Sequence, residues 1–341
     1  MQALSNVPKV SVIIPNYNHD RYLPKRISSI LNQTYQNFEI IYLDDASTDN
    51  SNQIFAEFSS DPRIQGIYNE VNTGNPFKQW NKGIREARGE YVWIAESDDY
   101  ADSRFLEVLI NALDKNPTAG FAYCQSWEVD ECDQVLSNYQ WFTARLDPER
   151  WKHDFVSRGI DECKNYVLFQ NTIPNASAVV FRKSIYEQVG GASKDMRLSG
   201  DWLFWSKLLL ESDIAFIAQP LNYFRKSNPK GARGNLGKEG LFLEEKFRVV
   251  HYICSQIDDL QENRLKSLHN HVYYWLECSL FNRIPFNRQW TIYQIIRDID
   301  PIINVTLIKM IIAILVKRCL RKLGITPIIK TLFKHSEQVQ V

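Results

Sequence analysis

The 341-residue chain lacks net charge, paired cysteines and any apolar run of membrane-spanning length. Its 40 basic and 40 acidic residues cancel, so the overall charge does not predict a nucleic-acid partner. The six cysteines include no C-x-x-C pair, and no histidine stands at zinc-ligand spacing, so neither a zinc site nor a disulfide framework is indicated. We therefore expect a reducing compartment.

Glycine-rich phosphate loops are also missing. No G-x-G-x-x-G follows an apolar run, and no G-x-x-x-x-G-K-[ST] occurs. If the protein binds phosphates, a divalent cation is then the expected means. The polar residues 1–9 precede an apolar run of only five residues, which is too short for the core of a signal peptide, and we expect a cytoplasmic protein.

Short apolar runs alternate with amphipathic helical patterns through the first 120 residues. This alternation is typical of βα units and predicts a parallel sheet. Residues 10–14 are continuous in apolar residues, as a strand buried on both faces should be. The other expected strands are residues 38–43 and 91–95, and residues 64–68 with a weaker strand pattern. The predicted fold class is α/β, with a mostly parallel Rossmann-like sheet flanked by helices.

Beyond Gly120 the alternation loosens. Residues 120–129, 177–181, 214–217 and 221–225 are expected strands, and residues 130–165 are expected to be irregular. A segment rich in glycine, proline and bases at residues 228–238 marks the predicted end of the catalytic unit. We therefore predict a catalytic domain over residues 1–235 and a helical C-terminal region over residues 236–341.

The last 41 residues are basic, with seven lysines and arginines against one acid. Residues 302–316 are mostly apolar, and at fifteen residues they fall short of the roughly twenty that span a bilayer. Two interpretations stay open, a buried core helix or a helix lying on an anionic membrane surface. We favour peripheral membrane contact through residues 301–341, which would place the protein at the inner face of the cytoplasmic membrane.

Three polar clusters follow expected strands at the edge where ligands of open α/β sheets gather. They are residues 15–18, Asp44 with Asp45, and residues 96–99 with the sequence Glu-Ser-Asp-Asp. Each cluster alone has a simpler explanation, because turns and helix N-termini favour the same residue types. Together the clusters predict a nucleotide site that holds a divalent cation through one or two carboxylates.

Four ordered segments resemble the motifs of family-2 glycosyltransferases, which have the GT-A fold. These segments are residues 10–18 (VSVIIPNYN), 28–35 (SSILNQTY), 41–49 (IYLDDASTD) and 89–99 (GEYVWIAESDD). The resemblance covers about the first 230 residues. It implies an inverting enzyme that uses a nucleotide-sugar donor and a Mn²⁺ or Mg²⁺ ion.

The resemblance also implies roles on the donor side. Pro15 and Tyr17 match the loop that lies against the nucleobase, and Asp45 matches the acid that accepts the ring N–H of the base. Glu96 stands where the family has the first Asp of its D-x-D motif, and Ser97 belongs to the same nucleotide site. Asp98 stands at the metal-binding Asp.

On the acceptor side, Asp201 resembles the family's catalytic base at the start of a helix. Asn175 and Ser177 match a segment beside the acceptor, and the neighbouring Trp202 offers a flat face to a sugar. Many relatives carry a His after the segment that matches Tyr223 to Arg225, but Lys226 follows here, so Arg225 or Lys226 is expected as a charge clamp near the diphosphate.

The expected function is transfer of a sugar, from UDP most simply, to a hydroxyl of a glycan or lipid-linked acceptor in bacterial surface polysaccharide synthesis. Asp201 would remove the acceptor proton. The expected partners are therefore the nucleotide sugar and that acceptor, without nucleic acid. Two alternatives are a metal-dependent nucleotidyltransferase, which would release pyrophosphate, and a non-catalytic glycan-binding scaffold. A processive synthase is less compatible, because no Q-x-x-R-W sequence occurs.

Overall fold

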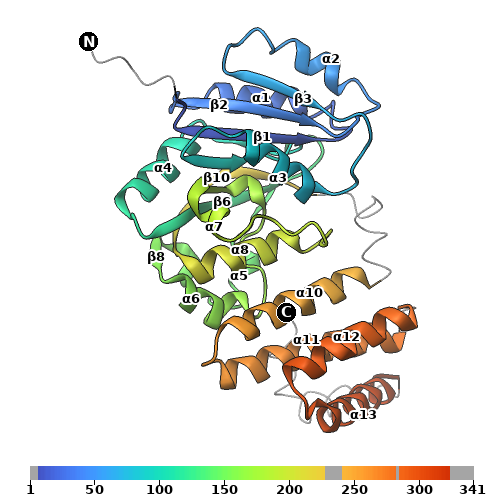
Figure 1. Ribbon diagram of the computed structural model, residues 1–341. Helices are drawn as coiled ribbons and strands as arrows, with labels where there is room; N and C mark the ends of the chain where they lie inside the picture. The colour runs from blue at the N-terminus through green and yellow to red at the C-terminus, as the bar shows by residue number, and fades with distance from the viewer. Residues whose placement is uncertain (1–6, 227–239, 282–283, 323–341) are drawn as a thin grey trace. The chain divides into compact units, whose positions relative to one another are not determined.

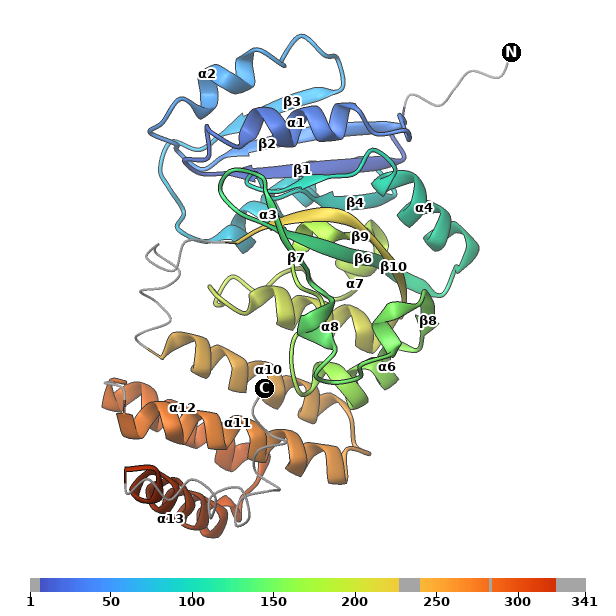
Figure 2. The same cartoon turned by 180° about the vertical axis from the view of Figure 1, so that it is seen from behind.

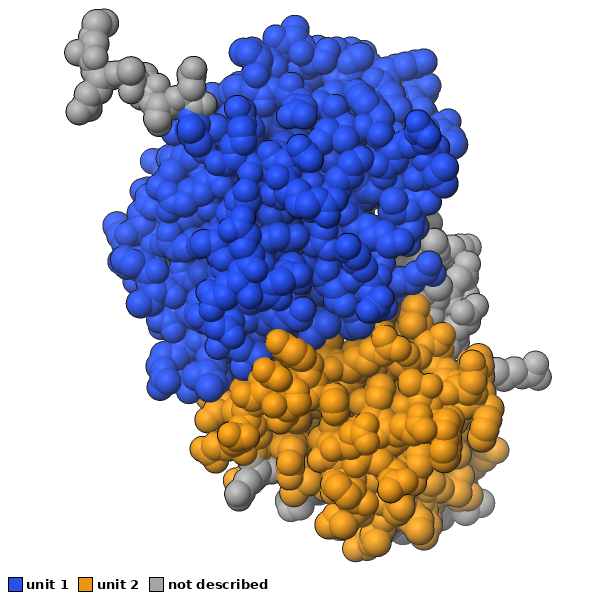
Figure 3. Space-filling view, in the orientation of Figure 1, with its two compact units in different colours: residues 1–163, 171–227 blue, residues 164–170, 228–341 orange. Residues whose placement is uncertain are grey.

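The computed structural model describes residues 7–226, 240–281 and 284–322. The chain divides into two compact units, which Figure 3 colours separately. One contains Met1–Cys163 and Asn171–Ser227, and the other contains Lys164–Gln170 and Asn228–Val341. The boundary predicted between residues 235 and 236 lies outside the described residues.

The first unit is built on a ten-stranded sheet (Figure 1). Along its main path the strand order is β3-β2-β1-β4-β9-β6-β10-β5, while β7 pairs with β6 and β8 pairs with β10. The strands are β1 (Val10–Asn16), β2 (Phe38–Asp44), β3 (Ile64–Tyr68), β4 (Tyr91–Ile94), β5 (Tyr100–Ala101), β6 (Ala119–Val129), β7 (Val135–Asn138), β8 (Phe155–Ser157), β9 (Val179–Arg182) and β10 (Asp213–Arg225).

The four strands expected in the first half of the chain are present and parallel, in the order β3-β2-β1-β4. The second half of the sheet is mixed, because β9 runs antiparallel to both of its neighbours, β4 and β6. Strand direction depends on how a connection returns the chain to the sheet, which the apolar pattern of a strand does not record. The sheet is therefore less uniformly parallel than the sequence alone suggests.

Two further local expectations differ from the structure. The strands expected at residues 214–217 and 221–225 form one strand, β10, whose register shifts around Pro220, a residue that cannot donate a ladder hydrogen bond. Residues 130–165 are not wholly irregular, since they contain β7, β8, two short α-helices and the 3₁₀ helix Arg150–Lys152. Both short strands pair with distant strands, so no local periodicity identifies them.

Helices cover both faces of the sheet. Side chains of α1, α2 and α4 pack into a core with alternate residues of β1, β2 and β4. On the opposite face, Gly83 of α3 lies against Ile13 and Leu43, and aromatic rings of α7 and α8 pack on Phe181. The helices are α1 (Leu23–Leu31), α2 (Ser51–Ala56), α3 (Pro76–Glu86), α4 (Phe105–Lys115), α5 (Gln140–Thr143), α6 (Gly159–Glu162), α7 (Lys183–Gln188) and α8 (Gly200–Glu211).

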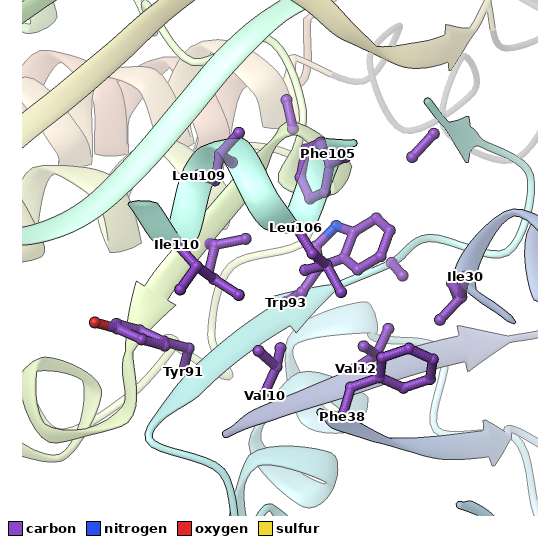
Figure 4. Close-up of a cluster of buried hydrophobic side chains, with 14 of the residues drawn as sticks. Val10, Val12, Ile30, Phe38, Tyr91, Trp93, Phe105, Leu106, Leu109 and Ile110 are labelled. Atoms are coloured by element: carbon purple, nitrogen blue, oxygen red, sulfur yellow. The ribbon is translucent and has the colours of Figure 1, made fainter. Parts of the chain in front are cut away.

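The core on the α1 and α4 face is shown in Figure 4. The indole of Trp93 lies 4.5 Å from the ring of Phe105 between ring centroids, and Val10 and Val12 are fully buried beside them. Burial of each such side chain stabilises the fold by about 1.5–3 kcal/mol. This core fixes β1 and β4, whose ends carry the predicted nucleotide site.

The described residues of the second unit beyond the linker are helical, with α10 (Leu241–Gln256), α11 (Gln261–Phe281), α12 (Phe286–Ile299) and α13 (Ile303–Lys322). The expected C-terminal helical extension is therefore present. Within the part of the chain that the structure describes, no helix combines the length and apolar character needed to cross a bilayer. Residues 323–341 of the predicted membrane-contacting segment lie outside it.

Candidate active site

The loops after β1 and β2 meet at one edge of the sheet, as the sequence predicts. Asn16 and Asp44 are partners in the parallel register of the two strands. The Asp44 carboxylate is hydrogen-bonded to residues that follow it in the chain. It accepts hydrogen bonds from the Ser47 N–H at 2.9 Å and from Nδ2 of Asn52 at 3.3 Å. Asp44 therefore shapes the turn that presents Asp45.

Asp45 is 5% exposed, and protein donors surround its carboxylate. Oδ1 accepts hydrogen bonds from Nδ2 of Asn69 and Nε2 of Gln79, both at 2.7 Å. Oδ2 accepts from the Thr73 hydroxyl at 2.8 Å, and the Thr73 N–H lies within 3.1 Å of both oxygens. Asp45 thus joins the loop after β2, the turn before α3, and α3 itself.

The two other predicted nucleobase contacts come from the loop after β1. Pro15 is buried in β1, opposite Leu43 in the register. The ring of Tyr17 is 45% exposed. Of these two predicted nucleobase contacts, Tyr17 is thus the one with an accessible aromatic ring.

The Glu96 to Asp99 segment directly follows β4. Oε1 of Glu96 accepts a hydrogen bond from Nε1 of Trp80 at 2.9 Å. Ser97 is buried, and its hydroxyl lies 2.8 Å from Nδ1 of His19, which joins the acidic segment to the loop after β1. The carboxylate of Asp98 is partly exposed and accepts no hydrogen bond from any residue in the described ranges. Asp98 is therefore available to a ligand.

Burial keeps two of these acids hard to ionise. It raises the pKa of Glu96 to about 8, and the neighbouring Asp98 charge adds to the effect, while the Trp80 hydrogen bond opposes it. Burial and Asp98 also raise the pKa of Asp99, whose Oδ1 accepts the Arg225 N–H at 2.8 Å. The raised pKa of Glu96 therefore favours its neutral form near neutral pH.

Arg26 of α1 is a site residue that the sequence analysis missed. Its side chain is fully buried, and it donates from Nε to the Glu96 carbonyl at 2.8 Å and from Nη2 to the Ser177 hydroxyl at 3.0 Å. Burial lowers the pKa of this guanidinium to about 10, while the three nearby carboxylates raise it. A signal was present, because Arg26 lies on the same apolar helix face as Leu23, Ile27 and Ile30.

The predicted Mn²⁺ or Mg²⁺ ion can be tested against the side chains that could coordinate it. Within the described ranges, no group of three or more His, Cys, Asp or Glu side chains is placed to hold a metal. Hard divalent cations at phosphate sites commonly use one or two protein carboxylates and take their other ligands from phosphates and water. The single open carboxylate of Asp98 fits that pattern. The described residues do not provide a site made only of protein ligands.

Asp201 lies in the first turn of α8. Its Oδ2 accepts a hydrogen bond from Nδ2 of Asn171 at 3.2 Å. The preceding Gly200 packs against α3 so closely that a Cβ atom there would lie 2.4 Å from the Phe77 ring. The start of α8 is therefore pressed directly against α3.

Helix α3 connects the predicted donor-side and acceptor-side residues. Gln79 and Trp80 donate to Asp45 and Glu96, as described above. On either side of them, Asn75 donates to the carbonyls of Lys194 and Met196 at 2.9 Å, and Asn81 exchanges two hydrogen bonds with Ala192. One helix thus positions the nucleotide loops and the segment that leads into Asp201.

The remaining predicted residues are placed as follows. Ser177 is fully buried and accepts the Glu96 N–H at 3.1 Å, and Asn175 is hydrogen-bonded to Asn222 at 3.1 Å. Trp202 is buried. These three side chains are therefore enclosed by other residues of the protein.

The two candidate phosphate clamps differ in exposure. Arg225 is buried, and it donates to the Asp98 carbonyl at 2.8 Å, to the Asp130 carbonyl and to Asp133. Lys226 is 64% exposed and pairs with Glu128 at 3.2 Å. Arg225 positions the acidic segment, whereas Lys226 retains the freedom of a surface lysine.

Comparison with known proteins identifies relatives. A model of the family described as Glycosyl transferase family 2 matches residues 11–190, which include the donor-side residues and end before Asp201. A glycosyltransferase of Haemophilus influenzae is 34% identical over 226 residues, covering 65% of this chain and 67% of the relative. Glycosyltransferase GlyG of Streptococcus pneumoniae is 32% identical over 232 residues, covering 64% and 70%.

Solved structures also match. S. aureus TarS in complex with UDP has a TM-score of 0.61 at 17% identity, covering 97% of this chain and 88% of that one. The mannosyltransferase PcManGT of Pyrobaculum calidifontis, in complex with GDP-Man and Mn²⁺, has a TM-score of 0.51 at 18% identity, covering 93% and 89%. At these identities the likeness shows a shared fold.

Proposed function

The chain belongs to Glycosyl transferase family 2, and from this premise we propose that it transfers a sugar from UDP to a hydroxyl of a glycan or lipid-linked acceptor, with inversion at the anomeric carbon. It is a glycosyltransferase enzyme with the GT-A fold. The observation that carries the proposal is the arrangement of one open carboxylate, Asp98, and one helix-start carboxylate, Asp201, on elements joined by α3.

On the donor side, Tyr17 would stack on the nucleobase, and Pro15 and Asp45 would shape the surface below it. Glu96 and Ser97 would face the ribose. The choice of UDP follows the TarS complexes with UDP and UDP-GlcNAc, because this donor is known for a protein of the same fold.

A divalent cation with a single protein ligand fits this site. Asp98 would hold Mn²⁺ or Mg²⁺, and the PcManGT complex with GDP-Man and Mn²⁺ shows that a protein of this fold uses such an ion. When bound, the cation supplies charge neutralisation for the leaving diphosphate. The exposed Lys226 would contribute a further positive charge, and Arg225 would keep the Asp98 backbone in place.

On the acceptor side, Asp201 would accept the proton of the attacking hydroxyl. The acceptor oxygen then forms a bond to the anomeric carbon as the bond from that carbon to the diphosphate oxygen breaks, and the nucleoside diphosphate departs with the electron pair. Attack opposite the leaving group inverts the anomeric configuration. Asn175, Ser177 and Trp202 would support this side of the site from within its walls.

The test compares Asp201→Asn with a matched control on the same helix, Glu211→Gln, whose carboxylate is exposed at the other end of α8. Asp201→Asn should lower the turnover number about 10³-fold and leave the donor dissociation constant within about twofold, because loss of a general base affects the transition state. Release of the corresponding nucleoside diphosphate from a panel of UDP, GDP and dTDP sugars is the readout. Turnover of Asp201→Asn close to that of Glu211→Gln would remove Asp201 from its role.

We also propose that the C-terminal unit contacts a membrane surface, which would suit a lipid-linked acceptor in cell-envelope polysaccharide synthesis. Val305, Ile308, Ile312 and Leu315 of α13 are 45–61% exposed, and their spacing puts them on one helix face. Lys309, Arg318 and Lys322 are exposed on the same helix, which suits anionic headgroups.

Sedimentation with vesicles tests this contact. The wild-type protein should bind phosphatidylglycerol vesicles more than phosphatidylcholine vesicles, and an Ile308→Ser/Ile312→Ser variant should lose that binding while keeping donor hydrolysis. Equal binding of the wild type to both lipids, or no effect of the double substitution, would contradict it.

A further inference from the structure

An exposed aromatic group lies on the segment between β6 and β8, which the sequence could not assign. Trp141 of α5 is 44% exposed. Its ring centroid lies 5.4 Å from that of Tyr139 and 5.8 Å from that of Phe142, and Tyr139 in turn packs edge-on to Phe224 of β10 at 5.7 Å. The indole is therefore supported from behind by rings that are anchored on the sheet.

The aromatic group is connected to the acceptor side of the active site. Figure 2 shows β7, which leads into α5, beside β6. The Tyr139 N–H donates to the Ser126 carbonyl at 2.9 Å. The hydroxyl of the same Ser126 accepts hydrogen bonds from Asn222 at 3.1 Å and from Asn175 at 3.4 Å.

Asn175 continues this path toward the chemistry. Four residues before it in the same loop, Asn171 donates to Asp201, the proposed base. Two residues after it, Ser177 accepts the N–H of Glu96. The aromatic group on α5 is thus attached to the loop that contacts both halves of the site.

A cation accompanies the ring. The guanidinium carbon of Arg145 lies 5.6 Å from the centroid of the Trp141 ring, and Arg145 has no carboxylate partner among the described residues. Arg145 lies over the ring, and Trp141 remains 44% exposed, so an apolar indole and a planar set of N–H donors are offered together. This combination matches a pyranose, which presents C–H bonds on one side and hydroxyl oxygens at its edge.

The size of the surface favours a sugar over a protein. A stable protein interface buries about 800 Å² on each partner, whereas this group offers one indole and one guanidinium. The exposed Val135 and Leu136 do not enlarge it, because they lie toward the opposite end of β7, where Val135 pairs with Val129.

We propose that Trp141 and Arg145 form a subsite for a pyranose ring of the acceptor, so that the enzyme glycosylates a glycan chain rather than a simple lipid alcohol or polyol. This proposal rests on the proposed function. It assigns the acceptor specificity of the enzyme to α5.

Binding of pyranosides can be measured without turnover. Saturation-transfer NMR with methyl α- and β-pyranosides of glucose, galactose, mannose and N-acetylglucosamine should show transfer from the wild-type protein to at least one of them. Trp141→Ala should weaken that binding about tenfold, since ring stacking contributes on the order of 1 kcal/mol. Trp141→Phe should retain most of it.

Trp290→Ala is the matched control, because Trp290 of α12 is similarly exposed, at 51%. It should bind as the wild type does, and all three variants should hydrolyse the donor at the wild-type rate. Absence of transfer to every pyranoside, or equal binding by Trp141→Ala and Trp290→Ala, would overturn the subsite. Failure of the wild type to hydrolyse any nucleotide sugar would instead refute the proposed function, so the two failures are distinguishable.

Discussion

The loops after β2 and β4 each carry an aspartate, but one carboxylate is buried and hydrogen-bonded and the other is partly exposed. Asp45, after β2, is nearly buried, and donors from Asn69, Thr73 and Gln79 surround its two oxygens. Asp98, after β4, accepts nothing through its carboxylate from the described residues and is partly exposed. The position of an acid at a strand end therefore does not define its role.

The difference lies in what surrounds each loop. The turn before α3 folds over the β2 loop and supplies the donors for Asp45. The β4 loop is held through main-chain groups instead, with the Glu96 carbonyl bonded to Arg26 and the Asp98 carbonyl bonded to Arg225. Anchoring by the backbone leaves the Asp98 side chain available for a ligand, whereas anchoring by the side chain makes Asp45 part of the framework.

The largest expected effect is on catalysis at Asp98. Asp98→Asn should lower sugar transfer about 10³-fold, because metal-assisted charge stabilisation is worth several kcal/mol. Mn²⁺-dependent binding of the nucleotide, measured by calorimetry, should be lost. The free energy of unfolding should change by no more than about 0.5 kcal/mol, and a large loss of stability would contradict the contrast with Asp45.

The next effect is on stability at Asp45. Asp45→Ala leaves buried donors on Asn69, Thr73 and Gln79 without their acceptor, so the free energy of unfolding should fall by about 3 kcal/mol. Urea denaturation followed by circular dichroism measures this change. Asp98→Ala, assayed in parallel, is the control. Equal stability of the two alanine variants would show that the hydrogen bonds of Asp45 contribute little to the fold.

The last effect is on the pH dependence of stability. Because the pKa of Glu96 is raised to about 8 in the folded protein, its carboxyl is protonated there while the unfolded chain, with a pKa near 4.3, is ionised. The folded state binds the extra proton, so Glu96 makes stability fall as pH rises from about 4.5 to about 8, by at most about 1.4 kcal/mol per pH unit. Glu96→Gln should remove that decline.

Unfolding midpoints at pH 5, 6.5 and 8 measure the decline. Glu90→Gln, which changes an acid at the opposite end of β4 where Lys9 and Arg182 pair with it, provides a control. A wild-type profile that Glu96→Gln leaves unchanged would show that Glu96 is ionised in the folded state.

The first half of the fold was predictable because β1, β2 and β4 are buried along their whole length and contain few polar residues. Ile64–Tyr68 has the bounds expected, and β1 and β2 exceed the expected strands at their C-terminal ends by two residues and one. The second half was less predictable, since β7 and β8 exist through pairing with β6 and β10 rather than through an apolar pattern of their own. The GT-A fold and the family, expected from four motifs, are confirmed.

The site was predictable where a motif carried it. The sequence indicated Asp98 and Asp201, and their roles remain predictions. It gave no sign that Gln79 and Thr73 would surround Asp45, because those contacts depend on how the turn before α3 packs. Arg26 could have been predicted from the sequence, since an arginine on the apolar face of a helix is expected to be buried and must then have hydrogen-bonding partners.

Helix α3 has a consequence for engineering. Its successive turns hold the donor loops through Gln79 and Trp80 and the approach to Asp201 through Asn75 and Asn81. A substitution in α3 that alters nucleotide preference would also displace the segment that leads to Asp201. Selection for a new donor there would therefore lower acceptor-side activity. Changes in α5 would instead act through the Tyr139 bond to the Ser126 carbonyl and through ring packing on Phe224.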